Sequence, residues 1–222
     1  MYEVKINKKD IEILKFINLF GKSFADVLGN TFFNTTQQAR DRLVKIKKMG
    51  LIRYKSTGLM KPRNAIFLTA EAKTMLIRMG ENIKDGKITI SSLEHNMLEQ
   101  IAFYWLGKIG DIDRALVYRD NSTLRHIPDM ILKINNKKIN VEVEITQKSK
   151  TNYKRSTLKM SEDNPYSVLY ICMNKKKALT IAKSLPSWDK FVFIDIETLI
   201  CNIKSQNRVG AMSQRKILGE GG

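Results

Sequence analysis

Residues 139–147 (INVEVEITQ) alternate apolar and polar side chains, which is the pattern of a β-strand whose two faces differ. Residues 129–134 (DMILKI) form a second strand-like run, and Asn135-Asn136 is a favourable hairpin turn between the two runs. One face of the later strand is apolar and must be core, whereas the other carries Asn140, Glu142, Glu144, Thr146 and Lys148. In such a hairpin Asp129 can lie beside Glu142, so the acids form either a metal site or a solvated polar face.

The elements around this hairpin predict an α/β domain over residues 86–204. In chain order we expect helix 90–110, strands 114–120, 129–134 and 139–147, helix 149–163, strand 167–173, helix 175–185, strand 190–196 and helix 197–203. Residues 167–173 (SVLYICM) are apolar without a break, which is typical of a buried strand. Residues 205–222 show no periodicity, so we expect a flexible tail there.

Residues 1–85 predict a separate unit with its own core. We expect helices over 7–20, 23–30 (with Ser23 as its N-cap) and 34–50, strands over 51–56 and 64–69, and a closing helix over 69–79. The loop between the two strands, TGLMKPR, carries two cations. Three helices followed by a basic hairpin resemble the winged helix-turn-helix family. That resemblance implies that the third helix enters the DNA major groove and that the hairpin tip grips the backbone.

The third expected helix has one apolar stripe, formed by Ala39, Leu43 and Ile46, that must face the core. Its other positions and the hairpin loop supply the candidate DNA-binding residues, which are Gln37, Gln38, Arg40, Lys45, Lys48, Lys61 and Arg63. An ordinary solvated helix has the same polar pattern, and some winged helices bind protein instead of DNA. The sequence therefore leaves these alternatives open.

The charge of the chain favours a polyanionic partner. Lys and Arg number 39 against 22 Asp and Glu, giving a net charge of +17 that residues 1–85 and 86–222 share. No segment is long and apolar enough to span a bilayer, and two cysteines with two histidines make a structural zinc site a poor explanation. We expect a cytoplasmic protein with reduced thiols that binds double-stranded DNA and not membranes, and a homodimer stays open.

The second unit resembles a family of nucleases. Element order, the Pro-Asp at 128–129 and the acid pair at 142 and 144 are similar to the PD-(D/E)xK superfamily, whose members share a restriction-endonuclease-type α/β fold. The resemblance covers about residues 86–204. Placed behind a winged helix, the pattern HIPD…VEVEITQ resembles the replication-relaxation proteins of plasmids and mobile elements, and is similar to one class of conjugative relaxases.

The resemblance implies a catalytic centre that binds Mg²⁺ or Mn²⁺. Asp129 and Glu142 would hold the metal, and Glu94 or Glu99 from the preceding helix would complete the site. Glu144 stands where nucleases of this superfamily carry lysine, a departure that the replication-relaxation proteins share, and Lys148 could supply the missing cation. A relaxase would also need a tyrosine nucleophile, for which Tyr153 is a candidate.

These observations predict three alternative functions. In the first, the protein binds DNA of a plasmid or mobile element and nicks or cleaves it with a divalent metal. In the second, it binds DNA without chemistry, as a regulator of replication or transcription. In the third, it is a protein–protein adaptor.

Overall fold

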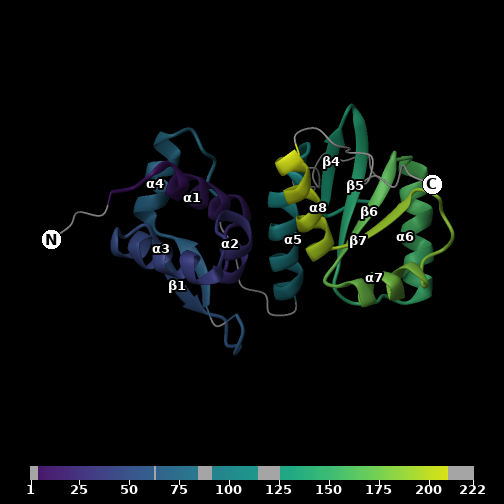
Figure 1. The fold of residues 1–222 in the computed structure, drawn as a ribbon, viewed down its shortest axis with the longest axis horizontal. Coiled ribbons are helices and arrows are strands. Elements are labelled where there is room, and N and C mark those ends of the chain that lie inside the picture. The colour runs from purple at the N-terminus through teal and green to yellow at the C-terminus, as the bar shows by residue number, and fades with distance from the viewer. Residues whose placement is uncertain (1–4, 63, 85–91, 115–125, 210–222) are drawn as a thin grey trace. The chain divides into compact units, whose positions relative to one another are not determined.

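The computed structural model describes residues 5–62, 64–84, 92–114 and 126–209. The chain is a mixed α/β protein with two compact units, residues 1–100 and 101–222, which are treated separately below (Figure 1). The division falls inside helix α5 (Leu93–Leu106), and the boundary expected between residues 85 and 86 lies outside the described residues. In the described ranges, no helix combines the length and the apolarity that crossing a membrane requires.

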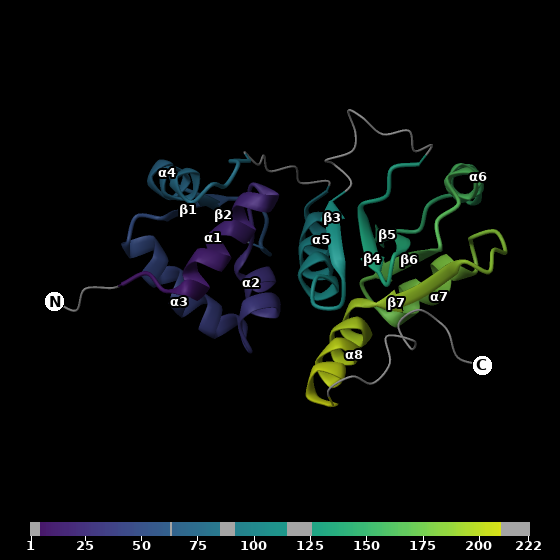
Figure 2. The ribbon, with the colours of Figure 1, turned by 90° about the horizontal axis from the view of Figure 1, so that it is seen from above.

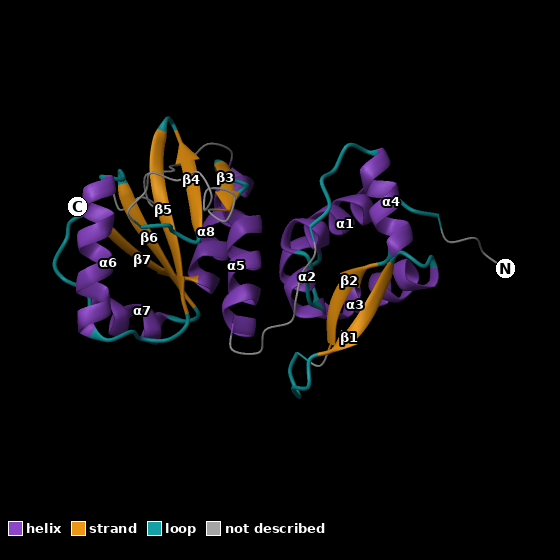
Figure 3. Cartoon of the chain, turned by 180° about the vertical axis from the view of Figure 1, so that it is seen from behind, coloured by secondary structure: helices purple, strands orange, loops and turns teal. Residues whose placement is uncertain are grey.

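The N-terminal unit has the expected order of helices and strands (Figure 3). Its elements are α1 (Lys8–Phe20), α2 (Ala25–Phe32), α3 (Thr36–Lys48), β1 (Ile52–Ser56), β2 (Asn64–Leu68) and α4 (Ala70–Arg78). The two strands are antiparallel, with Ile52 opposite Leu68 and Ser56 opposite Asn64. The loop between them, residues 57–63, contains Lys61 and the undescribed Arg63.

The core of this unit forms because each element turns an apolar stripe inward. Fully buried members of the core are Ile13, Leu14, Ile17, Leu28, Ala39, Leu43, Ile46, Ile66 and Leu76. The expected inward stripe of α3 is thus confirmed. Thr35 caps α3 by accepting a hydrogen bond from the Gln38 N–H, and Gly50, at φ +73°, adopts the left-handed conformation that ends it. A β-carbon on Gly29 would lie 2.8 Å from the Thr36 Cα, so glycine lets the α2 backbone approach α3 closely.

The prediction that Ser23 caps α2 is wrong. The N-cap is Phe24, which is fully buried and makes no side-chain capping bond. Ser23 instead pairs with β2, because its N–H donates to the Ile66 carbonyl (3.0 Å) and the Ile66 N–H donates to the Ser23 carbonyl (2.8 Å). A tertiary backbone pairing of this kind leaves no trace in local sequence.

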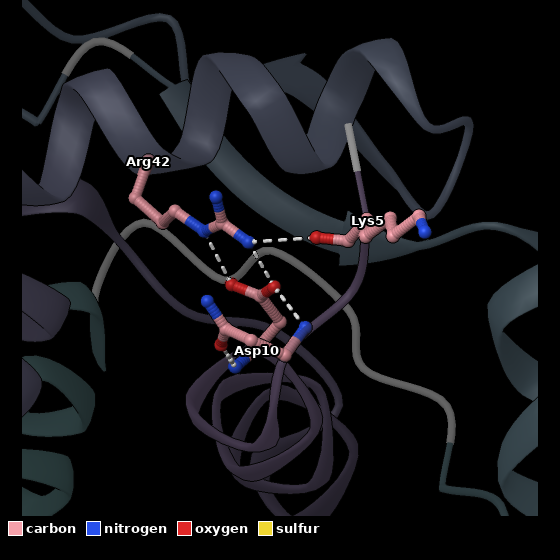
Figure 4. A network of polar contacts seen from close by, with 4 residues as sticks. Lys5, Asp10 and Arg42 are labelled. Carbon is pink, nitrogen blue, oxygen red and sulfur yellow. Dashed lines mark hydrogen bonds and ion pairs between the residues drawn. The ribbon is translucent and has the colours of Figure 1, made fainter. Parts of the chain in front are cut away.

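A buried ion pair joins α1 to α3 (Figure 4). Asp10 is fully buried, and its carboxylate accepts from the Arg42 Nε at 2.6 Å and from the Arg42 Nη2. The same carboxylate accepts from the Asn7 N–H (2.8 Å), and Arg42 Nη2 also donates to the Lys5 carbonyl (3.4 Å). Asp10 therefore completes a capping box and anchors α3 at the same time. The bond to Asp10 holds the pKa of Arg42 above its ordinary value despite partial burial.

The C-terminal unit is built on a mixed five-stranded sheet in the order β3-β4-β5-β6-β7. The strands are β3 (Asp111–Arg114), β4 (Met130–Ile134), β5 (Lys137–Glu144), β6 (Ser167–Cys172) and β7 (Phe191–Asp195). Helices α6 (Lys150–Asp163), α7 (Lys175–Ala182) and α8 (Ile196–Val209) follow β5, β6 and β7. Strands β3, β4 and β5 pair antiparallel, whereas β5, β6 and β7 are parallel.

Helices cover both faces of this sheet (Figures 1 and 2). On one side, α6 and α7 pack against β6 in a cluster that contains Tyr153, Met160, Val168, Tyr170, Cys172, Ala178 and Ile181. On the other side lie α8 and the second half of α5, residues 101–106 (Figure 2). Because both faces are covered, β5 and β6 are buried along most of their length.

The boundaries that differ from those expected include those of β3 and α8. Strand β3 occupies Asp111–Arg114, whereas the predicted strand 114–120 lies outside the described residues beyond Arg114. Three of its four residues are charged, so no apolar pattern marks it. Helix α8 continues to Val209 where a tail was expected from residue 205. Asp195 accepts from the Thr198 N–H at its start, and Leu199 and Ile203 are buried. Residues 210–222 are not described.

Replacing Arg42 with alanine leaves the buried Asp10 carboxylate without its guanidinium partner. We expect the free energy of unfolding to fall by about 3 kcal/mol, because removing one member of a buried ion pair strands the other. Urea denaturation of the full chain measures the change. Arg40→Ala is the matched control, since Arg40 lies 3.5 Å from Asp26, both side chains are exposed, and such pairs contribute under about 1 kcal/mol. Equal losses in the two variants would contradict this role of Arg42.

Candidate functional site

Strand pairing brings Asp129 and Glu142 together, as the sequence predicts. Met130 lies opposite Val141, so Asp129, one residue earlier, falls beside Glu142 on the same face of the sheet. Glu144 follows on that face of β5, opposite Cys172 of β6. This is the side of the sheet on which α6 packs.

The acids are buried rather than solvated. Glu142 and Glu144 expose only 7% and 4% of their surface, and Asn140 on the same face is fully buried. The interpretation of this face as the wet side of a hairpin is therefore wrong for Asn140, Glu142 and Glu144, whereas Thr146 and Lys148 at its end are exposed. The physical reason is α6, whose buried Tyr153 packs on the sheet beside the acids.

Each carboxylate has a specific partner. Asp129 Oδ2 accepts from the Val143 backbone N–H at 2.8 Å. Glu142 Oε1 lies 2.7 Å from His126 Nε2, and Glu144 Oε2 lies 2.7 Å from Lys148 Nζ. His126 is thus one of the hydrogen-bonded residues of the site, held further by its backbone N–H, which donates to Asp163.

Burial and neighbouring charges shift the pKa values of Glu142 and Lys148. Burial raises the pKa of Glu142, and the charge of Asp129 raises it further, while the His126 contact opposes both effects. For Lys148, burial alone would lower the pKa, but the bond to Glu144 and the charges of Glu144, Glu142 and Asp129 outweigh it, so its pKa is raised. Lys148 is therefore a cation whose field falls on all three acids, in keeping with its predicted place at the site.

The Asp129–Glu142 pair supplies the smallest donor set that suits Mg²⁺, which binds through one or two carboxylates and otherwise keeps water or substrate phosphate oxygens. In the described ranges, no group of three His, Cys, Asp or Glu side chains is placed to hold a metal ion. Neither amide atom of the buried Asn140, on the same face, has a hydrogen-bond partner among the residues that the structure describes. Metal binding by this pair, with the remaining ligands taken from outside the protein, therefore stays a prediction.

Two other predicted residues, Glu94 and Tyr153, differ in how the structure bears on their roles. Glu94 is exposed in the first turn of α5, on the N-terminal side of the division between the units, so its role stays a prediction. Tyr153 is buried, and its hydroxyl accepts from the Lys148 N–H at 3.1 Å. Burial raises the pKa of the Tyr153 hydroxyl, which disfavours the phenolate that a nucleophile needs. Tyr153 is therefore a core residue.

The N-terminal unit carries a separate feature, a cationic groove between α3 and the β1–β2 loop. The groove has a volume of about 880 Å³, and its lining includes Arg40, Val44, Lys47, Lys48, Tyr54, Met60, Lys61 and Pro62. Lys47 Nζ lies 5.3 Å from the centre of the Tyr54 ring, so the cation is held over an aromatic face. The lining holds four cations against one carboxylate, Asp26, so the groove has an excess of positive charge.

The predicted DNA-binding residues divide between the groove and the adjacent face of α3. Arg40, Lys48 and Lys61 line the groove, whereas Gln37, Gln38 and Lys45 are exposed beside it. Gln37 donates to Asp41 (2.8 Å), and Gln38 accepts from the Asn34 N–H (3.2 Å). Arg63 lies outside the described residues.

The lining residues that sequence reasoning missed include Val44, Lys47, Tyr54 and Met60. Val44 and Lys47 could have been found from their spacing. With Arg40 and Lys48 they stand at i, i+4, i+7 and i+8 and therefore share one side of α3.

No protein-family model matches the chain, and no curated protein matches its sequence.

The two neighbours of Glu142 should shift its pKa in opposite directions. His126→Ala removes a hydrogen bond that favours the carboxylate and should raise the pKa of Glu142, whereas Asp129→Asn removes a like charge and should lower it. A ¹³C NMR titration of the side-chain carboxyls measures both shifts, with the Glu142 signal assigned by its loss in Glu142→Gln. Shifts of the same sign would contradict the arrangement.

The raised pKa of Glu142 also predicts how stability depends on pH. The folded protein holds this proton more tightly than the unfolded chain, so the contribution to the free energy of unfolding falls as pH rises from about the ordinary value of 4.5 through the folded-state pKa. In Glu142→Gln this loss is removed. The stability of the variant relative to the parent should therefore increase over that range, as measured by urea denaturation at several pH values.

Proposed function

We propose that this protein binds double-stranded DNA through its N-terminal unit, with α3 in the major groove and the β1–β2 loop on the sugar–phosphate backbone. The observation that carries the proposal is the groove of about 880 Å³ whose lining holds four cations on these two elements. Phosphate neutralisation by lysine and arginine provides most of the non-specific affinity of proteins for DNA.

The composition of the groove suits DNA better than a generic acidic partner. Arg40 and the neighbouring Gln37 and Gln38 carry the groups that bond base edges, while Lys47, Lys48 and Lys61 suit phosphates. Val44 is half exposed at the centre of this face, where an apolar side chain can contact a thymine methyl group. The order of three helices and a hairpin supports a winged helix-turn-helix as the fold of this unit.

Removing two groove cations should weaken duplex binding and its dependence on salt. For Lys48→Ala with Lys61→Ala, we expect the slope of log affinity against log salt to fall by about 2, because each lost phosphate contact reduces it by about one. Fluorescence anisotropy with a mixed-sequence duplex measures the slope. Lys8→Ala with Lys9→Ala removes two exposed cations outside the groove and is the matched control. Affinity independent of salt, or equal losses in both pairs, would favour a protein–protein adaptor.

We propose, as a second function, that the C-terminal unit nicks or cleaves the bound DNA with Mg²⁺ or Mn²⁺. The proposal rests on the resemblance to PD-(D/E)xK nucleases and to replication-relaxation proteins of plasmids and mobile elements. Its structural support is the juxtaposition of Asp129 and Glu142, since a cation would relieve the repulsion that raises the pKa of Glu142.

The residues of the cluster have distinct roles in this proposal. Asp129 and Glu142 would hold the metal, which supplies a Lewis acid for the phosphodiester and a water of lowered pKa. Lys148, fixed by Glu144, keeps positive charge beside the acids and attracts the phosphate. The Val143 N–H orients Asp129, and His126 orients Glu142. The alternative is a catalytically silent regulator of replication or transcription, which would bind duplex DNA through the cationic groove without cleaving it.

Asp129→Asn and Glu142→Gln should each abolish metal-dependent nicking of supercoiled DNA while duplex affinity is retained, because neither residue lines the groove. A nicking assay with and without Mg²⁺ or Mn²⁺, on DNA from the protein's own genetic neighbourhood, measures this. Glu162→Gln alters an exposed carboxylate on α6 and should leave nicking unchanged. If the unmutated protein binds this DNA but does not nick it, the regulator is the correct function.

A further inference from the structure

A second basic pocket lies at the end of the sheet opposite the carboxylates. It has a volume of about 670 Å³ and is formed where β5, β6 and β7 begin, whereas Glu144 is the last residue of β5. Its lining contains three lysines, Lys137, Lys138 and Lys190, against one acid, Asp189. This pocket shares no residue with the cationic groove or with the carboxylate cluster.

The lysines of this pocket are held in place by the fold. Asn135 and Asn136, at φ 49° and 62°, make the turn that leads into Lys137. Lys137 Nζ donates to the Tyr166 hydroxyl at 2.6 Å and lies 4.0 Å from the centre of its ring. The pocket therefore presents a cation and an aromatic ring as one fixed unit.

Lys190 is fixed on the other wall. Its Nζ donates to Asn164 Oδ1 at 2.7 Å and to the Pro165 carbonyl at 3.0 Å. Asn164 takes a left-handed conformation (φ 46°) to end α6, which is why its side chain reaches the pocket. An ammonium has three donors, so after these two bonds Lys190 retains one N–H for an anion.

We propose that this pocket binds one nucleotide of a single-stranded nucleic acid, with its phosphate at Lys138 and Lys190 and its base stacked on Tyr166. The excess of positive charge selects an anion. The ring of Tyr166 selects a planar partner, since this residue exposes 41% of its surface. The strand must be unpaired, because bases in a duplex are already stacked on one another. An acidic peptide would match the lysines but would leave the ring without a planar partner.

The stacking half of the proposal is tested with two substitutions of Tyr166 in the full chain. Tyr166→Ala should weaken binding of a labelled oligothymidylate by about tenfold, because base–aromatic stacking contributes on that scale. Tyr166→Phe keeps the ring and loses only the hydroxyl, so its affinity should stay within about twofold of the parent. Unchanged binding by Tyr166→Ala, or an equal loss in Tyr166→Phe, overturns the proposal.

The phosphate half is tested with the lysine pair. Lys138→Ala with Lys190→Gln, which keeps a donor for Asn164 and Pro165, should lower the salt slope for oligothymidylate by about 1.4, since each phosphate contributes about 0.7 on a single strand. Lys159→Ala with Lys183→Ala removes the same charge from exposed sites outside the pocket and should leave the slope unchanged. Equal effects of the two pairs overturn the proposal.

Measuring duplex binding by the same variants distinguishes this proposal from the proposal that the cationic groove binds duplex DNA. We expect the Tyr166 and Lys138/Lys190 variants to bind a mixed-sequence duplex like the parent, whereas the Lys48/Lys61 variant loses duplex affinity and keeps the Tyr166-dependent part of oligothymidylate binding. If the protein binds no duplex but Tyr166→Ala still weakens oligothymidylate binding, only the proposal that the cationic groove binds duplex DNA is refuted. If the protein binds duplex through the cationic groove but Tyr166→Ala does not weaken oligothymidylate binding, only the proposal for the second basic pocket is refuted.

Discussion

Strand β5 is buried on both faces from Ile139 to Glu144 although three of these buried residues are polar, and this burial governs the chemistry of the C-terminal unit. A carboxylate removed from water must find a partner or take up a proton. The acids of the cluster do so separately, through a backbone N–H for Asp129, an imidazole for Glu142 and an ammonium for Glu144. The result is a group of acids held in one place, in which burial raises the pKa of Glu142.

The pairing within this site could be predicted, whereas its surroundings could not. Alternation along residues 139–147 and the Asn-Asn turn are local signals, and together they set the register that places Asp129 beside Glu142. Burial of the polar face depends on α6, which follows in the chain and covers the sheet through Tyr153. Sequence periodicity reports which side chains share a face, but not which element later covers that face.

The same distinction holds in the N-terminal unit. The inward stripe of α3 could be read from its spacing, and the exposed Gln37 and Lys48 follow from it. The groove could not, because it exists only where the β1–β2 loop approaches α3 and brings Met60 and Lys61 to Val44 and Lys47. The position of strand β3 was not predicted for another reason. Its charged residues form a strand by pairing with the β4 backbone, and no apolar pattern in the sequence marks them.

The Asn7–Asp10–Arg42 network has a consequence for how the groove meets its ligand. By fastening α3 to the start of α1, it fixes the backbone that carries Arg40 and Lys47 before any partner arrives. A surface held in advance loses little conformational freedom on association, so less of the interaction energy is consumed in ordering the protein. If the groove binds DNA as proposed, affinity at this surface would be governed mainly by the release of counterions and by the deformation of the DNA.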